Sequence, residues 1–253
     1  MPKLLATEFV GNGNQMQSTI TGSSFSFSAV KPDKLDSTEY TLVTIVVDIT
    51  GSVYGFEDEL KRMVQYCVRA CQKNSRSENI MVRIIHFNTN IYEIHGFIPV
   101  SGIDADAYED INPGGITALY DASVNGIGAT ADYGRVLTDQ DFTVNAAVYI
   151  ITDGGDNAST HGPGDVMKAL KACRTDEVLE SVVSVLIGVN SAGCKSYLDA
   201  FKQDAGLDSL ILTNDASEST LGKLANIISQ SISSQSQALG TGGGSVAPAS
   251  LSF

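Results

Sequence analysis

The sequence predicts an α/β protein with a Rossmann-like, doubly wound fold: a mainly parallel sheet flanked by helices on both faces. Two near-continuous apolar runs, YTLVTIVVDI (40–49) and AAVYIITD (146–153), are typical of strands that are covered on both sides. Between residues 56 and 73, apolar side chains recur at i, i+3 and i+4, which predicts one buried helix face. Strand-like and helix-like segments of this kind alternate along the chain, and alternation implies a parallel sheet with right-handed crossovers.

The remaining elements follow the same patterns. We expect strands at 40–49, 79–88, 91–100, 146–153, 181–189 and 209–214, and helices at 56–73, 117–130, 166–173, 195–203 and 217–231. This gives a domain at 40–234, preceded by an N-terminal arm at 1–39 that either adds an edge strand through SSFSFSAV (23–30) or stays disordered. Residues 235–253 are rich in Gly, Ser and Ala, which predicts a flexible tail.

Composition limits the classes of function. The 253 residues include 16 basic and 29 acidic side chains, for a formal net charge of −13. Such a charge argues against a nucleic-acid partner and suits a soluble protein or one with a cationic partner surface. We expect no membrane span, because no apolar run reaches about 20 residues. The first ten residues lack the pattern of a signal peptide, so we expect a cytoplasmic protein.

The four cysteines predict no metal site or disulfide framework. They form no C-x-x-C pair, and no histidines follow at zinc spacing. We expect reduced, mostly buried thiols at Cys67, Cys71, Cys173 and Cys194.

Three loops follow the expected strands or open an expected helix, and each carries oxygen-bearing side chains. Asp48, Thr50 and Ser52 follow the first buried strand, Thr117 stands behind a Pro-Gly-Gly turn, and Asp153 ends a second buried strand. Ligands of open parallel sheets bind beyond the carboxyl ends of the strands, so we expect these side chains to converge there. Two carboxylates and three hydroxyls are hard ligands that suit Mg²⁺ or Mn²⁺.

These residues resemble the metal-ion-dependent adhesion site of the von Willebrand factor A domain family. The family motif D-x-S-x-S is matched by Asp48, Thr50 and Ser52, with threonine in place of the first serine. A G-x-T-x-L motif is matched around Thr117, and a strand-ending T-D-G around Asp153. Order and spacing fit from about residue 40 to residue 231, which is most of the chain.

The resemblance implies a divalent cation, Mg²⁺ first and Mn²⁺ or Ca²⁺ as alternatives, and protein binding rather than catalysis. Thr50, Ser52 and Thr117 would bind the cation directly, Asp48 and Asp153 directly or through water, and a partner's Asp or Glu would complete the shell. The chain is similar to intracellular bacterial members of the family that work beside ATPases or in stress and defence systems. The sequence does not indicate an oligomeric state.

Two other interpretations stay open. Asp48-Ile-Thr-Gly-Ser52 also resembles the D-K-T-G-T motif of haloacid-dehalogenase-type phosphotransferases, in which Asp48 would be the nucleophile. That chemistry needs a lysine beside the phosphoryl group, and there is none between Lys73 and Lys168. Alternatively, the site could hold a purely structural ion.

Several nearby polar residues fall outside the predicted site. Asp121 suits the helix N-terminus, and Asp156 and Asn157 suit turn chemistry. His161 follows in the same loop, and we expect it to be exposed or structural. An acidic loop at 104–110 either flanks the site or is simply solvated.

Overall fold

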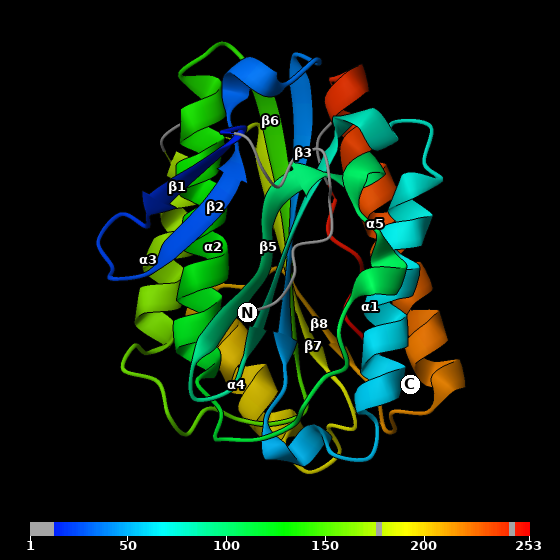
Figure 1. The fold of residues 1–253 in the computed structure, drawn as a ribbon. Helices are drawn as coiled ribbons and strands as arrows, with labels where there is room; N and C mark the ends of the chain where they lie inside the picture. The colour runs from blue at the N-terminus through cyan, green and yellow to red at the C-terminus, as the bar shows by residue number, and fades with distance from the viewer. Residues whose placement is uncertain (1–12, 176–178, 243–245) are drawn as a thin grey trace.

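A computed structural model describes residues 13–175, 179–242 and 246–253, and nine strands of this part form one sheet in the order β1-β2-β5-β4-β3-β6-β7-β8-β9 (Figure 1). Among these described strands only β1 with β2 and β4 with β5 pair antiparallel. The mainly parallel, doubly wound fold predicted from the sequence is therefore confirmed.

The central strands coincide with the apolar runs. β3 (Glu39–Asp48) pairs with β4 (Ile80–Phe87) on one side and β6 (Thr143–Thr152) on the other, and β7 (Ser181–Gly188) follows β6. All residues of β3 and β6 after the first are buried, as expected for strands covered on both faces. β5 (Ile91–Pro99) runs antiparallel beside β4.

Helices cover both faces of the sheet (Figure 1). On one face α1 (Glu57–Gln72) packs against α5 (Glu218–Thr241). On the other face α2 (Leu119–Thr138) packs against α3 (Pro163–Thr175), which packs against α4 (Lys195–Ala205). Short 3-10 turns lie at Pro32–Lys34, Gly51–Val53, Ser77–Asn79, Val100–Gly102 and Ala105–Ala107.

The described part of the N-terminal arm adds two strands to one edge of the sheet. β1 (Gln15–Thr19) and β2 (Ser26–Val30) form an antiparallel hairpin, and β2 pairs with β5. Phe27 is buried against Phe97 and Tyr133. The hairpin is thus fixed by burial of an aromatic side chain in the same core.

The C-terminal region is more ordered than its composition predicts. α5 continues ten residues beyond Ser231, the end predicted from the sequence, and buries Gln235 and Ser236. Arg76 donates to Ser236, with 3.3 Å between Nε and Oγ. The two-residue strand β9 (Leu251–Ser252) then pairs with β8 (Ser209–Leu212). The boundaries proposed for arm, domain and tail stay a prediction.

α2 lies unusually close to the sheet at Gly126. A Cβ atom at this position would come within 2.7 Å of Val46 Cγ2 on β3, which is too near for real carbon atoms. On its other side α2 is held by the hairpin loop, because the Thr21 backbone N–H donates to Asp132 Oδ2 at 2.6 Å. The helix is therefore fixed between the sheet and the N-terminal hairpin.

The cysteines match their prediction. All four are free, with Cys67, Cys71 and Cys173 buried and Cys194 partly exposed. Burial raises the pKa of the Cys71 thiol to about 12, which keeps it protonated. Within the described ranges no helix combines the length and the apolar character needed to cross a bilayer.

Candidate metal centre

The two predicted aspartates lie at the carboxyl ends of neighbouring parallel strands. Val47 on β3 faces Ile151 on β6, so the two strands end at the same edge of the sheet. Asp48 is the last residue of β3, and Asp153 directly follows β6. The register of the sheet thus brings together two acids that are far apart in the chain.

Hydrogen bonds connect four of the five predicted residues. Asp48 Oδ1 accepts from the Thr50 backbone N–H at 2.9 Å. The hydroxyls of Thr50 and Ser52 lie 2.9 Å apart, and Ser52 Oγ donates to Asp153 Oδ1 at 2.8 Å. Asp48, Thr50, Ser52 and Asp153 therefore form a continuous polar chain across the edge of the sheet.

Thr117, the fifth predicted residue, lies on a loop that is hydrogen-bonded to the loop after β3 and to the loop after β6. The Gly114 N–H donates to the Ile49 carbonyl at 3.0 Å. The Thr117 N–H donates to Asn157 Oδ1 at 2.7 Å, and the Asn157 N–H returns a bond to the Thr117 carbonyl at 2.9 Å. Its hydroxyl makes no hydrogen bond within the described part of the chain. The backbone of Thr117 is thus fixed while its hydroxyl oxygen stays available.

The Pro-Gly-Gly turn before Thr117 requires glycine at Gly115. Its φ of +80° is in the left-handed region, where side chains are strained. A Cβ there would also come within 2.8 Å of Thr89 Oγ1 at the turn between β4 and β5. The same threonine oxygen accepts from the Ile116 N–H at 3.1 Å. The turn therefore places Thr117 by a close backbone approach that only glycine permits.

The site holds more negative charge than the protein compensates. Asp48 is 1% exposed, and burial raises its pKa to about 6, with the neighbouring Asp153 raising it further and hydrogen bonds from Thr152 and Thr50 opposing the rise. Burial likewise raises the pKa of Asp153. Among the described residues no lysine, arginine or histidine pairs with either carboxylate. The site lacks a cation of its own.

The donor set fits a hard divalent cation. No three His, Cys, Asp or Glu side chains gather as a metal group in the described part of the chain, so a cation here would depend on hydroxyl oxygens beside two carboxylates. Carboxylate and hydroxyl oxygens suit Mg²⁺, Mn²⁺ or Ca²⁺; zinc more often takes nitrogen and sulfur but also binds carboxylate oxygens. Partial burial also strengthens any charge interaction at this edge.

Sequence reasoning missed several supporting contacts. Thr152 donates its hydroxyl to Asp48 Oδ2 at 2.6 Å; its place in the strand-ending T-D-G motif was the available signal. Asn157 orients the Thr117 backbone, and nothing in the sequence pairs these two residues. The Asp121 carboxylate accepts from the His161 backbone N–H at 2.9 Å and lies 2.7 Å from His161 Nδ1, so its described hydrogen bonds go to the facing loop and not to the start of its own helix.

Comparison with known proteins places the fold. No protein-family model matches the chain, and no curated protein matches it significantly. Among solved structures, the PilB minor pilin of Streptococcus sanguinis is similar at a TM-score of 0.55 and 16% identity, over 79% of this chain and 63% of the pilin. The pilus adhesin SpaC of Lactobacillus rhamnosus GG gives 0.52 and 12%, over 82% of this chain and 32% of the adhesin.

A mussel protein adds to this group. The proximal thread matrix protein 1 of the mussel byssus, in a structure with a zinc-occupied metal-ion-dependent adhesion motif, gives a TM-score of 0.50 and 15% identity, over 79% of this chain and 46% of that protein. The fold is von Willebrand factor A-like. This chain spans less than two-thirds of each of these proteins. At these identities the likeness concerns the fold, and the role of the site needs its own evidence.

Proposed function

We propose that the chain is a divalent-cation-dependent protein-binding module, with its site formed by Asp48, Thr50, Ser52, Thr117 and Asp153. The observation that carries the proposal is a pair of carboxylates, Asp48 buried and Asp153 half-buried, that are linked through hydroxyls and have no cationic side chain beside them among the described residues. A bound cation would neutralise this charge. The zinc-occupied motif in the mussel structure of the same fold supports the proposal.

The five residues would contact the cation in two different ways. Thr50, Ser52 and Thr117 offer neutral oxygens for direct contact, and Asp48 and Asp153 act directly or through water. When bound, the cation supplies an electrophilic position that a carboxylate of another protein can occupy. Mg²⁺ fits the all-oxygen donor set first, with Mn²⁺ and Ca²⁺ as alternatives. The partner is therefore a protein that presents an Asp or Glu side chain.

The setting of this module is part of the same proposal. We infer a binding protein without catalytic activity that acts in the bacterial cytoplasm, within an assembly linked to an ATPase or to stress or defence. The net charge of −13 supports a protein partner and argues against nucleic acid.

The alternative function is a phosphotransferase with Asp48 as nucleophile. A phosphoryl aspartate needs a cationic side chain close to it. Neither Asp48 nor Asp153 has a described ion pair, and the buried Arg83 is bonded to Glu93 instead. The hydroxyls of Thr50 and Ser52 beside the two acids suit a cation better than a phosphoryl group.

Affinity capture tests the proposal directly. The protein, bound to a resin, is exposed to native lysate in Mg²⁺ and again in EDTA, with Asp48→Ala beside the wild type. Asp33→Ala is the matched control, because Asp33 is an exposed acid in the turn at Pro32–Lys34, before β3. We expect capture in Mg²⁺ by wild type and Asp33→Ala, and loss of capture in EDTA or with Asp48→Ala.

Two outcomes would contradict the proposal. Capture that persists in EDTA and with Asp48→Ala would show that the interaction does not depend on a cation at this site. A covalent phospho-intermediate with turnover of a simple phosphoester in Mg²⁺ would establish the phosphotransferase instead. Replacing acids of the captured protein one by one by the corresponding amide then tests for the carboxylate that completes the shell, since one such change should abolish capture.

A further inference from the structure

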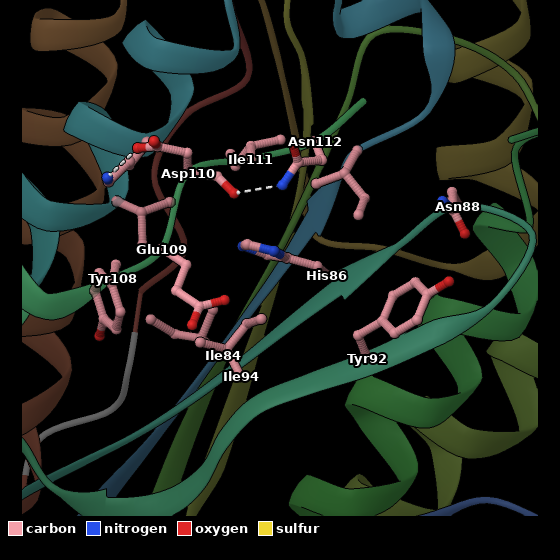
Figure 2. A pocket seen from close by; sticks show the side chains of 13 residues that line it. Ile84, His86, Asn88, Tyr92, Ile94, Tyr108, Glu109, Asp110, Ile111 and Asn112 are labelled. Carbon is pink, nitrogen blue, oxygen red and sulfur yellow. Dashed lines mark hydrogen bonds and ion pairs between the residues drawn. The ribbon is translucent and has the colours of Figure 1, made fainter. Parts of the chain in front are cut away.

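A second candidate site lies beside the metal centre. A cavity of about 360 Å³ opens between α1, the β4–β5 hairpin and the loop before the Pro-Gly-Gly turn (Figure 2). Five aliphatic side chains make its apolar walls: Ile49, Val64, Ile84, Ile94 and Ile111. This volume is in the range of small-molecule sites, which combine apolar walls with a few polar groups.

His86 is the polar group in the floor of this cavity. Its ring projects from β4 into the space that Figure 2 shows. Within the described residues neither ring nitrogen has a hydrogen-bond partner. Burial, and to a smaller extent the neighbouring His95, lowers the pKa of His86 to about 4. The imidazole is therefore neutral near pH 7 and has one donor and one acceptor to offer.

Charges around the cavity favour a cationic ligand. Lys61 is already bonded to Asp110 at 2.7 Å. Glu109 also lines the cavity, and its carboxylate forms no ion pair with a described residue. Because His86 is neutral, the lining carries one uncompensated negative charge. An anionic ligand would have to face Glu109 and break the Lys61 pair.

An aromatic side chain lies across the cavity from Glu109 (Figure 2). Tyr92 lines the cavity and is 45% exposed. The apolar walls, in turn, can cover an aromatic or short alkyl body. The cavity thus has a surface for each part of a compact organic cation.

We propose that this cavity binds a small primary amine with an apolar body. The five aliphatic walls and the Tyr92 ring take the body, Glu109 takes the ammonium group, and His86, which lies between Glu109 and Tyr92 in Figure 2, accepts an N–H hydrogen bond. Ile49, which lies between Asp48 and Thr50, forms part of the wall, so the amine would lie next to the loop that carries Asp48, Thr50 and Ser52. The inference does not depend on the metal proposal, and binding in EDTA separates the two.

Three probes of similar size test the selectivity: 2-phenylethylamine, 2-phenylethanol and 3-phenylpropionate. Binding to the full chain is measured by ligand-observed NMR titration at pH 7.5 in EDTA. We expect the amine to bind at least about fivefold more tightly than the alcohol, and the carboxylate more weakly still. Equal affinity for amine and carboxylate would overturn the proposal.

Variants then test the assigned roles. Glu109→Gln should weaken the amine about fivefold without changing the alcohol, whereas Glu180→Gln, which removes an exposed acid just before β7, should change neither. Ile94→Trp, which fills the cavity, should abolish binding of all three probes. Unchanged amine affinity in Glu109→Gln, or binding that survives Ile94→Trp, would place the amine elsewhere and contradict the proposal.

The role of His86 has a separate readout. An N,N,N-trimethyl derivative of the amine keeps its charge but has no N–H to donate. Wild type should prefer the primary amine over this derivative, and His86→Leu should lose that preference while it keeps the preference for cation over carboxylate. A preference that is the same in both proteins would show that His86 does not accept a hydrogen bond from the amine. The melting temperature of each variant confirms that it is folded.

Discussion

Two groups of charged side chains lie on the same sheet, and they differ in whether a counter-charge lies beside them. Beneath α2, the fully buried guanidinium of Arg83 donates to Glu93 at 2.7 Å and to Asn125 at 2.9 Å. At the edge of the sheet, the carboxylates of Asp48 and Asp153 accept hydrogen bonds only from hydroxyl and backbone groups in the described part of the chain. The charge of the first group is compensated by an ion pair, whereas the second has no counter-charge among the described residues. A buried acid without a cation therefore indicates function more strongly than a buried ion pair does.

The largest expected change in stability comes from removing the Arg83–Glu93 ion pair. Glu93→Leu leaves Arg83 buried without a counter-charge, so the free energy of unfolding should fall by about 3 to 5 kcal/mol. Urea unfolding followed by circular dichroism measures this loss. The double variant Arg83→Met/Glu93→Leu is the control, and it should recover most of the lost stability. If the double variant is as unstable as the single one, the loss does not come from the unpaired charge.

Adding Mg²⁺ as the counter-charge for Asp48 and Asp153 should change the free energy of unfolding somewhat less. Mg²⁺ at a hundred times its dissociation constant should raise the free energy of unfolding by about 2.7 kcal/mol, because it binds only the folded chain. EDTA should reverse the gain, and Asp48→Asn should show no gain. Thermal unfolding with and without Mg²⁺ measures it. A wild-type melting temperature that is insensitive to Mg²⁺, Mn²⁺ and Ca²⁺ would contradict the comparison.

The smallest expected effect is a pH dependence in the absence of metal. The folded pKa of Asp48, about 6, lies above its ordinary value of 3.8, so protonation of Asp48 stabilises the fold at low pH, and this contribution is lost as the pH rises through 6. In EDTA, Asp48→Asn should therefore be more stable than wild type at pH 7, because the amide is not ionised. This advantage should disappear as the pH falls from 6 to 4.

Comparing the two proteins at each pH makes the measurement specific. His86 and His95 titrate in an overlapping range, since burial lowers the pKa of each to about 4, but they contribute equally to both proteins. Paired urea unfolding curves at pH 4, 5, 6 and 7 give the difference. A difference that does not change with pH would mean that Asp48 has an ordinary pKa in the folded chain.

The sequence predicted the fold and the main positions of the site for the same reason. Buried strands show as apolar runs, and Asp48 and Asp153 end two such runs, so their position at one sheet edge followed from the parallel arrangement. α5 beyond Ser231 was not predicted, because the turns it buries carry Ser and Gln, which show no apolar period. The cavity around His86 was not predicted either, since it is formed by side chains from β4, β5, α1 and a loop that meet only in the folded chain.

The close contact at Gly126 has a consequence for the energetics of recognition. α2 starts two residues after Thr117, packs against Val46 with no room for a side chain at Gly126, and is bonded to the hairpin at Asp132. One wall of the site is therefore in place before any ligand arrives. In the proposed complex little ordering entropy would then be lost on binding, so most of the attraction between the proposed cation and a partner carboxylate would appear as affinity.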